Sequence, residues 1–142
     1  WAGELDVVGW NPVTGDLVNY EPSIDANAWP KREERYKRKF SVAKKHVRDI
    51  PQLAAVPKEA LTSLRCVAVL SHSPKGMPER MQWLDGELIT HDALMDDIEQ
   101  WLRENHGLTS KGAIPETHPL LRMLQLALLG SYRRRTSEMR AA

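Results

Sequence analysis

The sequence predicts an α/β domain, with an α+β arrangement as the alternative. Its 142 residues suit one compact domain, and its 42% hydrophobic and 27% charged residues are close to the averages of folded globular proteins. Strand-like and helix-like stretches follow one another in the order ββαβββαα. The nearly continuous apolar run at residues 64–70, in the middle of this order, is typical of an interior strand.

The first two strands are expected at residues 4–10 and 16–21. The segment between them contains Pro12, which fixes its own φ, and Gly15, which permits a positive φ. These two residues predict a turn, and the two strands are therefore expected to form an antiparallel hairpin.

A helix is expected to follow, from Asn27 or Trp29 to about residue 47. Pro30 falls in its first turn, where the missing N–H is tolerated. Apolar residues recur along this segment at helical spacing. They are Trp29, Tyr36, Phe40, Ala43 and Val47.

The middle of the chain predicts further short elements around the interior strand. Residues 58–64 are expected to form one or two helical turns before that strand. Residues 81–84 and 87–90 are expected to form a second hairpin, with Asp85-Gly86 as its two-residue turn.

Two helices are expected to complete the domain. Thr90 can cap a helix from residue 91 to about 106. The last helix is expected from Thr117 or His118 to about residue 132. It is apolar nearly all round, which predicts that it is buried or contacts a partner chain. We expect a single domain over residues 1–142, made of a core (1–106) and a C-terminal helical extension (115–135).

Several classes of protein are excluded by composition. No apolar run approaches the roughly 20 residues that cross a bilayer, so no membrane span is expected. A disulfide framework is excluded because Cys66 is the single cysteine. We expect no signal peptide and a cytoplasmic protein. It opens at Trp1 in a strand-like pattern, so we expect that it is a fragment or that earlier residues were removed.

Charge is strongly segregated although the net charge is only +1. Residues 31–48 contain nine Lys and Arg, against Glu33, Glu34 and nothing else that is acidic before Asp49. Such a segment can present a positive field to a polyanion. The alternative is an ordinary solvated helix face, and the sequence leaves both interpretations open.

The first hairpin carries a candidate metal site. If Trp10 pairs with Leu17, then Asp6 lies directly opposite Glu21, with Cβ atoms about 5 Å apart. Two facing carboxylates repel each other unless a cation lies between them, and Mg²⁺ favours one or two carboxylates together with a substrate phosphate. In the alternative, the register is shifted by one residue and the acids face water.

Residues 3–8 (Gly-Glu-Leu-Asp-Val-Val) and 17–21 (Leu-Val-Asn-Tyr-Glu) resemble the core of the PD-(D/E)XK nuclease superfamily. That group includes restriction endonucleases and Holliday-junction resolvases. The resemblance implies a restriction-endonuclease-like mixed sheet flanked by helices, and a DNA endonuclease that depends on Mg²⁺ or Mn²⁺. It implies that Asp6 and Glu21 are catalytic metal ligands, with the carbonyl of Pro22 as a further ligand. The first helix and strand of the family would precede this chain.

The chain departs from the family at Ser23, where the motif has a lysine. Some members of the family recruit a lysine from the following helix, and Lys31 is our first candidate for that catalytic role. Arg35 and Lys37 are the other candidates. The alternative is a catalytically degraded site.

The basic helix is expected to contact DNA phosphates on either side of the site. The residues expected to bind nucleic acid are Lys31, Arg32, Arg35, Lys37 and Arg38. One alternative is a nuclease-fold domain that binds DNA without cutting it. The other is an interaction domain that docks through helix 118–132 onto another protein or onto its own copy as a homodimer.

Overall fold

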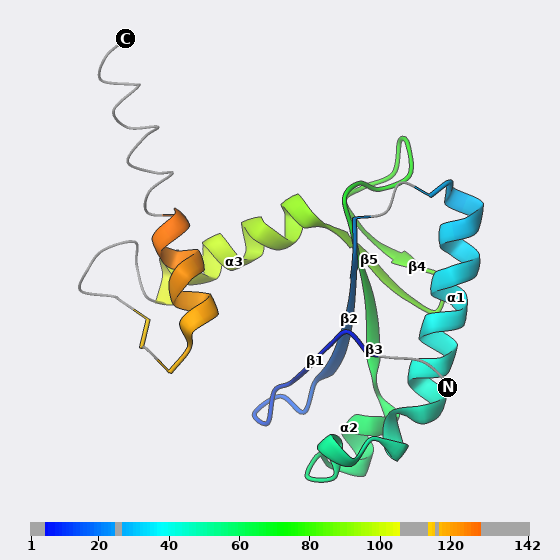
Figure 1. The fold of residues 1–142 in the computed structure, drawn as a ribbon, viewed down its shortest axis with the longest axis horizontal. Coiled ribbons are helices and arrows are strands. Elements are labelled where there is room, and N and C mark those ends of the chain that lie inside the picture. Colours follow the sequence, from blue (N-terminus) through cyan, green and yellow to red (C-terminus); the bar gives the residue numbers. More distant parts are fainter. Residues whose placement is uncertain (1–4, 25–26, 106–113, 116, 129–142) are drawn as a thin grey trace. The chain divides into compact units, whose positions relative to one another are not determined.

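The computed structural model describes residues 5–24, 27–105, 114–115 and 117–128. The chain divides into two compact units, residues 1–94 and 95–142. The first unit is built on a five-stranded mixed sheet with strand order β1-β2-β3-β5-β4 (Figure 1). The elements are β1 (Val7–Trp10), β2 (Leu17–Ser23), α1 (Trp29–His46), α2 (Lys58–Thr62), β3 (Arg65–Leu70), β4 (Arg80–Trp83), β5 (Gly86–Thr90) and α3 (His91–Asn105). The predicted α/β class is confirmed as a mixed sheet flanked by helices.

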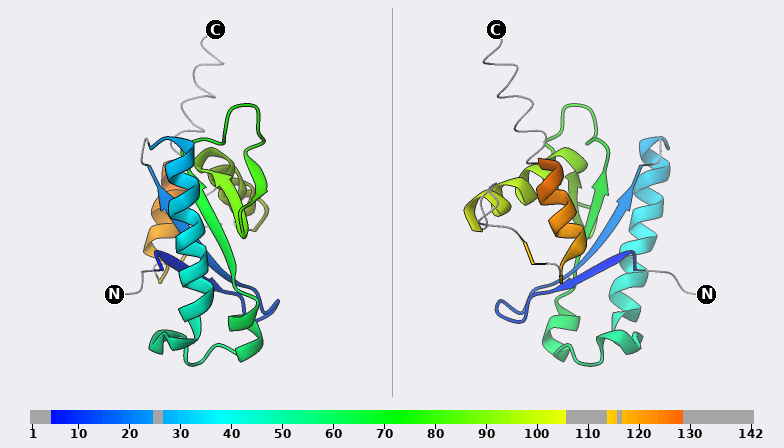
Figure 2. Two further views of the ribbon diagram at one scale, coloured as in Figure 1. Left: turned by 90° about the vertical axis from the view of Figure 1, so that its right-hand side faces the viewer. Right: turned by 60° about the vertical axis from the view of Figure 1, so that its left-hand side comes forward.

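The three central strands, β2, β3 and β5, are parallel, whereas β1 and β4 are antiparallel strands at the two edges. Helix α1 connects β2 to β3 and runs along one face of the sheet (Figure 1 and Figure 2). The first turn of α3 packs on the other face, where Ala93 and Leu94 contact valines of β2 and β3. One face of β2 is therefore directed towards α1 and the other towards the start of α3.

The first hairpin has the register that faces Asp6 with Glu21, one of the two that the sequence left open. Trp10 pairs with Leu17, and Val7 pairs with Tyr20. The main-chain N–H of Asn11 donates to the carbonyl of Asp16 at 2.9 Å, which closes the connection. Continued by one residue beyond the end of β1, this register places Asp6 opposite Glu21.

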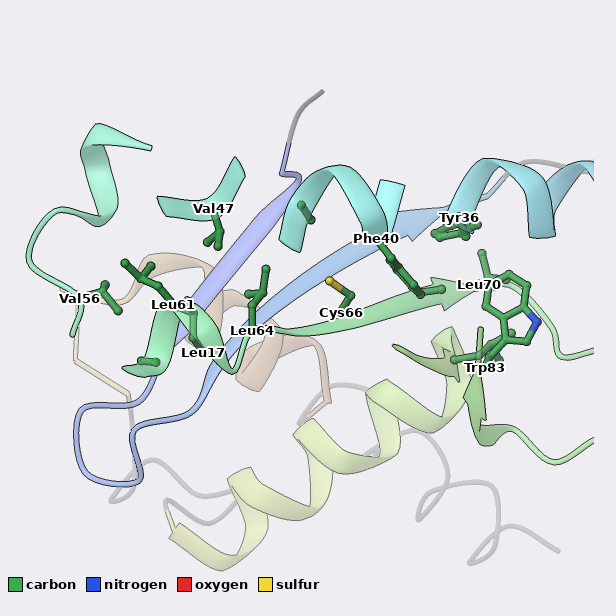
Figure 3. Close-up of a cluster of buried hydrophobic side chains, with 14 residues drawn as sticks. Leu17, Tyr36, Phe40, Val47, Val56, Leu61, Leu64, Cys66, Leu70 and Trp83 are labelled. Carbon is green, nitrogen blue, oxygen red and sulfur yellow. The ribbon is translucent and has the colours of Figure 1, made fainter. Parts of the chain in front are cut away.

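The core between α1 and the sheet contains the apolar stripe that the sequence predicts. Tyr36, Phe40 and Ala43 are buried, and they pack with Leu17 and Cys66 in one cluster (Figure 3). Burial raises the pKa of the Cys66 thiol to about 11. Cys66 is thus a small core residue with little thiolate at neutral pH.

The second hairpin differs from the prediction by one position. Trp83 pairs with Gly86, so the two-residue turn is Leu84-Asp85 and Gly86 belongs to β5. A Cβ atom at Gly86 would lie 2.4 Å from the carbonyl oxygen of Cys66 and 2.7 Å from the ring of Phe40. The glycine is therefore needed where the sheet passes beneath Phe40, and Leu84 takes the turn position with φ 56°.

Helix α3 begins as predicted, because the hydroxyl of Thr90 accepts a hydrogen bond from the N–H of Ala93 at 3.2 Å. The last helix is described over residues 119–128, and the rest of its predicted length lies outside the described residues. Three of its large apolar side chains are exposed rather than buried. They are Leu120, Met123 and Leu126. No helix in the described parts of the chain is long and apolar enough to cross a bilayer.

Candidate active site

Three charged side chains from separate segments of the chain meet on the α1 side of the sheet. The ammonium of Lys39 donates a hydrogen bond to Asp6 Oδ2 at 3.1 Å and a second one to Glu21 Oε2. Asp6 directly precedes β1, Glu21 lies on β2, and Lys39 lies on α1. One cation therefore bridges two carboxylates that are 15 residues apart in the sequence.

The local structure explains why these side chains converge. Alternate residues of a strand share a face, so Glu21 points to the same side as Leu17, which packs under α1. Residues three apart on a helix also share a face, so Lys39 follows Tyr36 towards the sheet. The Tyr36 hydroxyl donates to the main-chain oxygen of Glu21 at 3.1 Å, which ties α1 to β2 beside the carboxylates.

The three groups differ in their access to solvent. Glu21 has no exposed side-chain surface, whereas the side chains of Asp6 and Lys39 are 28% and 25% exposed. The alternative in which the acids simply face water is therefore wrong for Glu21. A solute would reach the cluster from the Asp6 and Lys39 side, with Glu21 at its inner end.

The electrostatics of the cluster favour a charged lysine. Burial raises the pKa of Glu21, and hydrogen bonds from Lys39 and Asn19 offset this only in part. Burial of Lys39 would lower its pKa, but the hydrogen bonds to Glu21 and Asp6 and their negative charges outweigh it, so the pKa of Lys39 is raised. Lys39 is thus a hydrogen-bond donor and a positive charge at neutral pH.

Asn19 is a member of this cluster that sequence reasoning missed. It is fully buried, and its Nδ2 donates to Glu21 Oε1 at 2.8 Å. Its place two residues before Glu21 on one strand was the available signal, because that spacing puts both side chains on the same face. A buried asparagine side chain needs such a polar partner.

The structure brings Lys39, and not Lys31, to the carboxylates. Lys31 is exposed in the first turn of α1, and eight helical residues separate the two lysines by about 12 Å along the axis. We therefore replace Lys31 by Lys39 in the site. The sequence does contain an indication of this position, because Lys39 lies three residues after the buried Tyr36 and therefore on the same face of the helix.

Arg32 does not belong to the surface on which the sequence places it. It is 1% exposed, its guanidinium lies 5.0 Å from the centre of the Trp29 ring, and its Nη1 is 3.4 Å from Nε2 of His72. The expectation that Arg32 contacts phosphates is therefore wrong. The other four predicted contacts are exposed on α1, namely Lys31, Arg35, Lys37 and Arg38.

The residues present fit a hard divalent cation. The ammonium of Lys39 already shows that Asp6 Oδ2 and Glu21 Oε2 converge on one cation-sized position. Within the described ranges, no three side chains from His, Cys, Asp and Glu come together, so the protein would supply two carboxylates. Mg²⁺ is commonly held by one or two carboxylates, with water and phosphate as its other ligands. Pro22 follows in β2, where it pairs with Val69, and its carbonyl remains a predicted ligand.

Comparisons with models of protein families, with curated proteins and with solved structures found no match to this chain. The chemistry of the site therefore has to be inferred from its own residues.

Proposed function

We propose that this chain is a Mg²⁺-dependent DNA endonuclease of the PD-(D/E)XK type in which Lys39 takes the place of the motif lysine. The supporting observation is that the Lys39 ammonium contacts both Asp6 and Glu21. The resemblance implies an Asp, an acidic residue on the next strand and a lysine, and the chain has Ser23 at the usual position of the lysine. A lysine from α1 supplies the missing positive charge.

The roles of the three residues follow from their contacts. Asp6 and Glu21 would hold Mg²⁺ or Mn²⁺, with the carbonyl of Pro22 as a further ligand. The metal, when bound, polarises the scissile phosphate and lowers the pKa of a coordinated water. Lys39 would stabilise the charge that develops on the phosphate oxygens. The pKa of Lys39 is raised by its contacts with Glu21 and Asp6, and we assign Lys39 the role of a cation rather than of a base.

The surface of α1 is suited to hold the DNA beside this site. Lys31, Arg35, Lys37 and Arg38 are exposed along the helix that carries Lys39. Contacts from such residues to phosphates give affinity that depends on salt and little on sequence. We infer that α1 positions the backbone while Asp6, Glu21 and Lys39 act on it.

The test is a cleavage assay with supercoiled plasmid and branched DNA in Mg²⁺, Mn²⁺ or EDTA. We expect nicking that requires the metal. Lys39→Met should slow it by about 10²-fold to 10³-fold, because it removes a donor from the developing charge. Lys45→Met, at an exposed lysine of the same helix that lies outside the proposed DNA contacts, is the matched control and should leave the rate unchanged. Equal rates for Lys39→Met and the wild type would contradict the assignment.

A second candidate is a nuclease-fold domain that binds DNA without cutting it. The observation that favours it is the ion pair itself, because the Lys39 ammonium neutralises the two carboxylates without any metal. A salt-dependent shift of DNA by the folded chain, with no nicking in Mg²⁺ or Mn²⁺, would select this function.

A further inference from the structure

Asn19 is a polar side chain in the core whose role packing does not explain. It is fully buried on β2, and its Oδ1 has no hydrogen-bond partner among the residues that the structure describes. A buried oxygen without a partner is unfavourable, and an apolar side chain of similar size would avoid it. The side-chain amide of Asn19 donates from Nδ2 to Glu21 Oε1 at 2.8 Å.

This hydrogen bond gives the two oxygens of Glu21 different surroundings. Oε1 is held by Asn19 inside the core, whereas Oε2 faces Lys39 and, beyond it, Asp6. A cation that replaces the ammonium between the two acids would therefore meet one oxygen of Glu21. The second oxygen already accepts a hydrogen bond from Asn19.

Coordination by one carboxylate oxygen discriminates between divalent cations. Mg²⁺ requires a compact octahedral set of single oxygens at short distance, with several positions filled by water. Ca²⁺ accepts six to eight oxygens at longer distance and often takes both oxygens of one carboxylate. A glutamate that is limited to one oxygen removes that advantage of Ca²⁺.

We propose that Asn19 is a positioning residue that sets the cation specificity of the site. By holding Oε1, it restricts Glu21 to coordination through Oε2 and so favours Mg²⁺ or Mn²⁺ over Ca²⁺. Asn19 acts through Glu21 and does not touch the cation. The inference rests on the proposed function, because it takes Asp6 and Glu21 as the ligands.

The test is calorimetric titration of the whole chain with Mg²⁺ and with Ca²⁺, without DNA. Asn19→Leu removes the donor at nearly constant size. Its affinity for Mg²⁺ should fall about tenfold, as is typical when a partner of a ligating carboxylate is lost. Its affinity for Ca²⁺ should be unchanged or higher, because both oxygens of Glu21 become available. An equal loss for both cations would overturn the proposal.

The matched control is Tyr36→Phe, which removes a hydrogen bond to the main-chain oxygen of Glu21 but leaves Oε1 untouched. The ratio of the two affinities should not change in this variant. Asn19→Ala is a second variant without the donor, for use if the leucine does not fit. If both Asn19 variants unfold while Tyr36→Phe folds, Asn19 serves the fold alone and the proposal fails.

The result separates this proposal from the nuclease assignment. If the wild type binds neither cation, both the nuclease assignment and the proposed role of Asn19 are wrong. If the wild type binds Mg²⁺ and its ratio of Mg²⁺ to Ca²⁺ affinity equals that of Asn19→Leu, only the proposed role of Asn19 is wrong. If the ratio of the Mg²⁺ and Ca²⁺ affinities differs between Asn19→Leu and the wild type, but the wild type does not cut DNA, the role of Asn19 is supported and the nuclease assignment is wrong.

Discussion

The two hairpins lie at opposite edges of one sheet, and they differ in the side chains that they bury. The face of the β1–β2 hairpin bears Asn19 and Glu21, with Asp6 beside them, and these polar groups are satisfied largely by one another and by Lys39. The face of the β4–β5 hairpin is apolar and fits closely under α1. Trp83, Gly86 and Leu88 lie there. The first edge buries a charged and a polar side chain, Glu21 and Asn19, and buried polar groups of this kind are typical of a functional site.

The largest expected effect is the loss of DNA cleavage when the acidic residues of the first hairpin are substituted. If the chain is the proposed nuclease, Asp6→Asn and Glu21→Gln should each lower the nicking rate by about 10³-fold or more, because each removes a charge that would hold the metal. Glu87→Gln is the matched change on the second hairpin, where the carboxylate pairs with Arg65 on the partly exposed side of β5. It should cut DNA at the normal rate. Circular dichroism would show that all three variants are folded, and normal cleavage by Asp6→Asn would contradict the comparison.

The second largest effect concerns stability and the other hairpin. Gly86→Ala places a methyl group 2.4 Å from the Cys66 carbonyl, so it should lower the free energy of unfolding by about 3 kcal/mol. Gly15→Ala, in the first hairpin, meets no atom within 4 Å but adopts φ 77°. It should cost about 1 kcal/mol, because the left-handed conformation is unfavourable for alanine.

Urea unfolding of both glycine variants measures this difference. Equal losses would mean that the sheet moves away from Phe40 to admit the methyl group. The second hairpin would then be no more tightly constrained than the first.

The same contrast explains how far the sequence alone leads. The first hairpin itself follows from local chemistry, since Pro12 and Gly15 favour its turn, and the observed register then faces Asp6 with Glu21. The turn of the second hairpin is set by a distant contact between Gly86 and Phe40, which no local pattern reveals. Local turn preferences therefore predicted the first hairpin but left its register open, and they placed the turn of the second hairpin one residue too late.

The candidate site shows the same limit. The two acids are predictable because they lie on paired strands, where the register fixes the neighbours of each residue. Lys39 is not predictable in this way. The sequence offers Lys31, Arg35 and Lys37 as replacements for the motif lysine, and only the position of α1 over the sheet shows which basic residue reaches the acids. Arg32 illustrates the reverse error, since a basic residue in a basic segment is buried against Trp29.

A smaller effect should appear in the pH dependence of stability. In EDTA, burial raises the pKa of Glu21 above its ordinary value of 4.5, so the folded state favours the protonated acid. This contribution is fully present below pH 4.5 and is lost as the pH rises through the raised pKa. The raised pKa of Lys39 adds no slope in this range, because Lys39 is charged throughout it.

Glu21→Gln cannot ionise and supplies the reference. The free energy of unfolding of the wild type, relative to Glu21→Gln, should therefore fall as the pH rises and then become constant. Urea unfolding of both proteins between pH 4 and pH 8 measures it. A difference that grows in favour of the wild type with rising pH would show that Lys39 and Asn19 more than compensate for burial.

The smallest expected effect concerns the helix that follows each hairpin. After the second hairpin, Thr90 caps α3 with its hydroxyl, so Thr90→Ala should lower the free energy of unfolding by about 1 kcal/mol. After the first hairpin, Ala28 precedes α1 with extended backbone (φ −61°, ψ 149°) and no side-chain cap. Because that backbone suits a capping residue, Ala28→Asp should raise the free energy of unfolding by about 1 kcal/mol. Urea unfolding at pH 7 measures both changes, and Ala28→Asn separates the hydrogen bond of the cap from its charge. If neither substitution at Ala28 stabilises the chain, then the start of α1 is held by Pro30 and the buried Arg32, and a cap adds nothing to it.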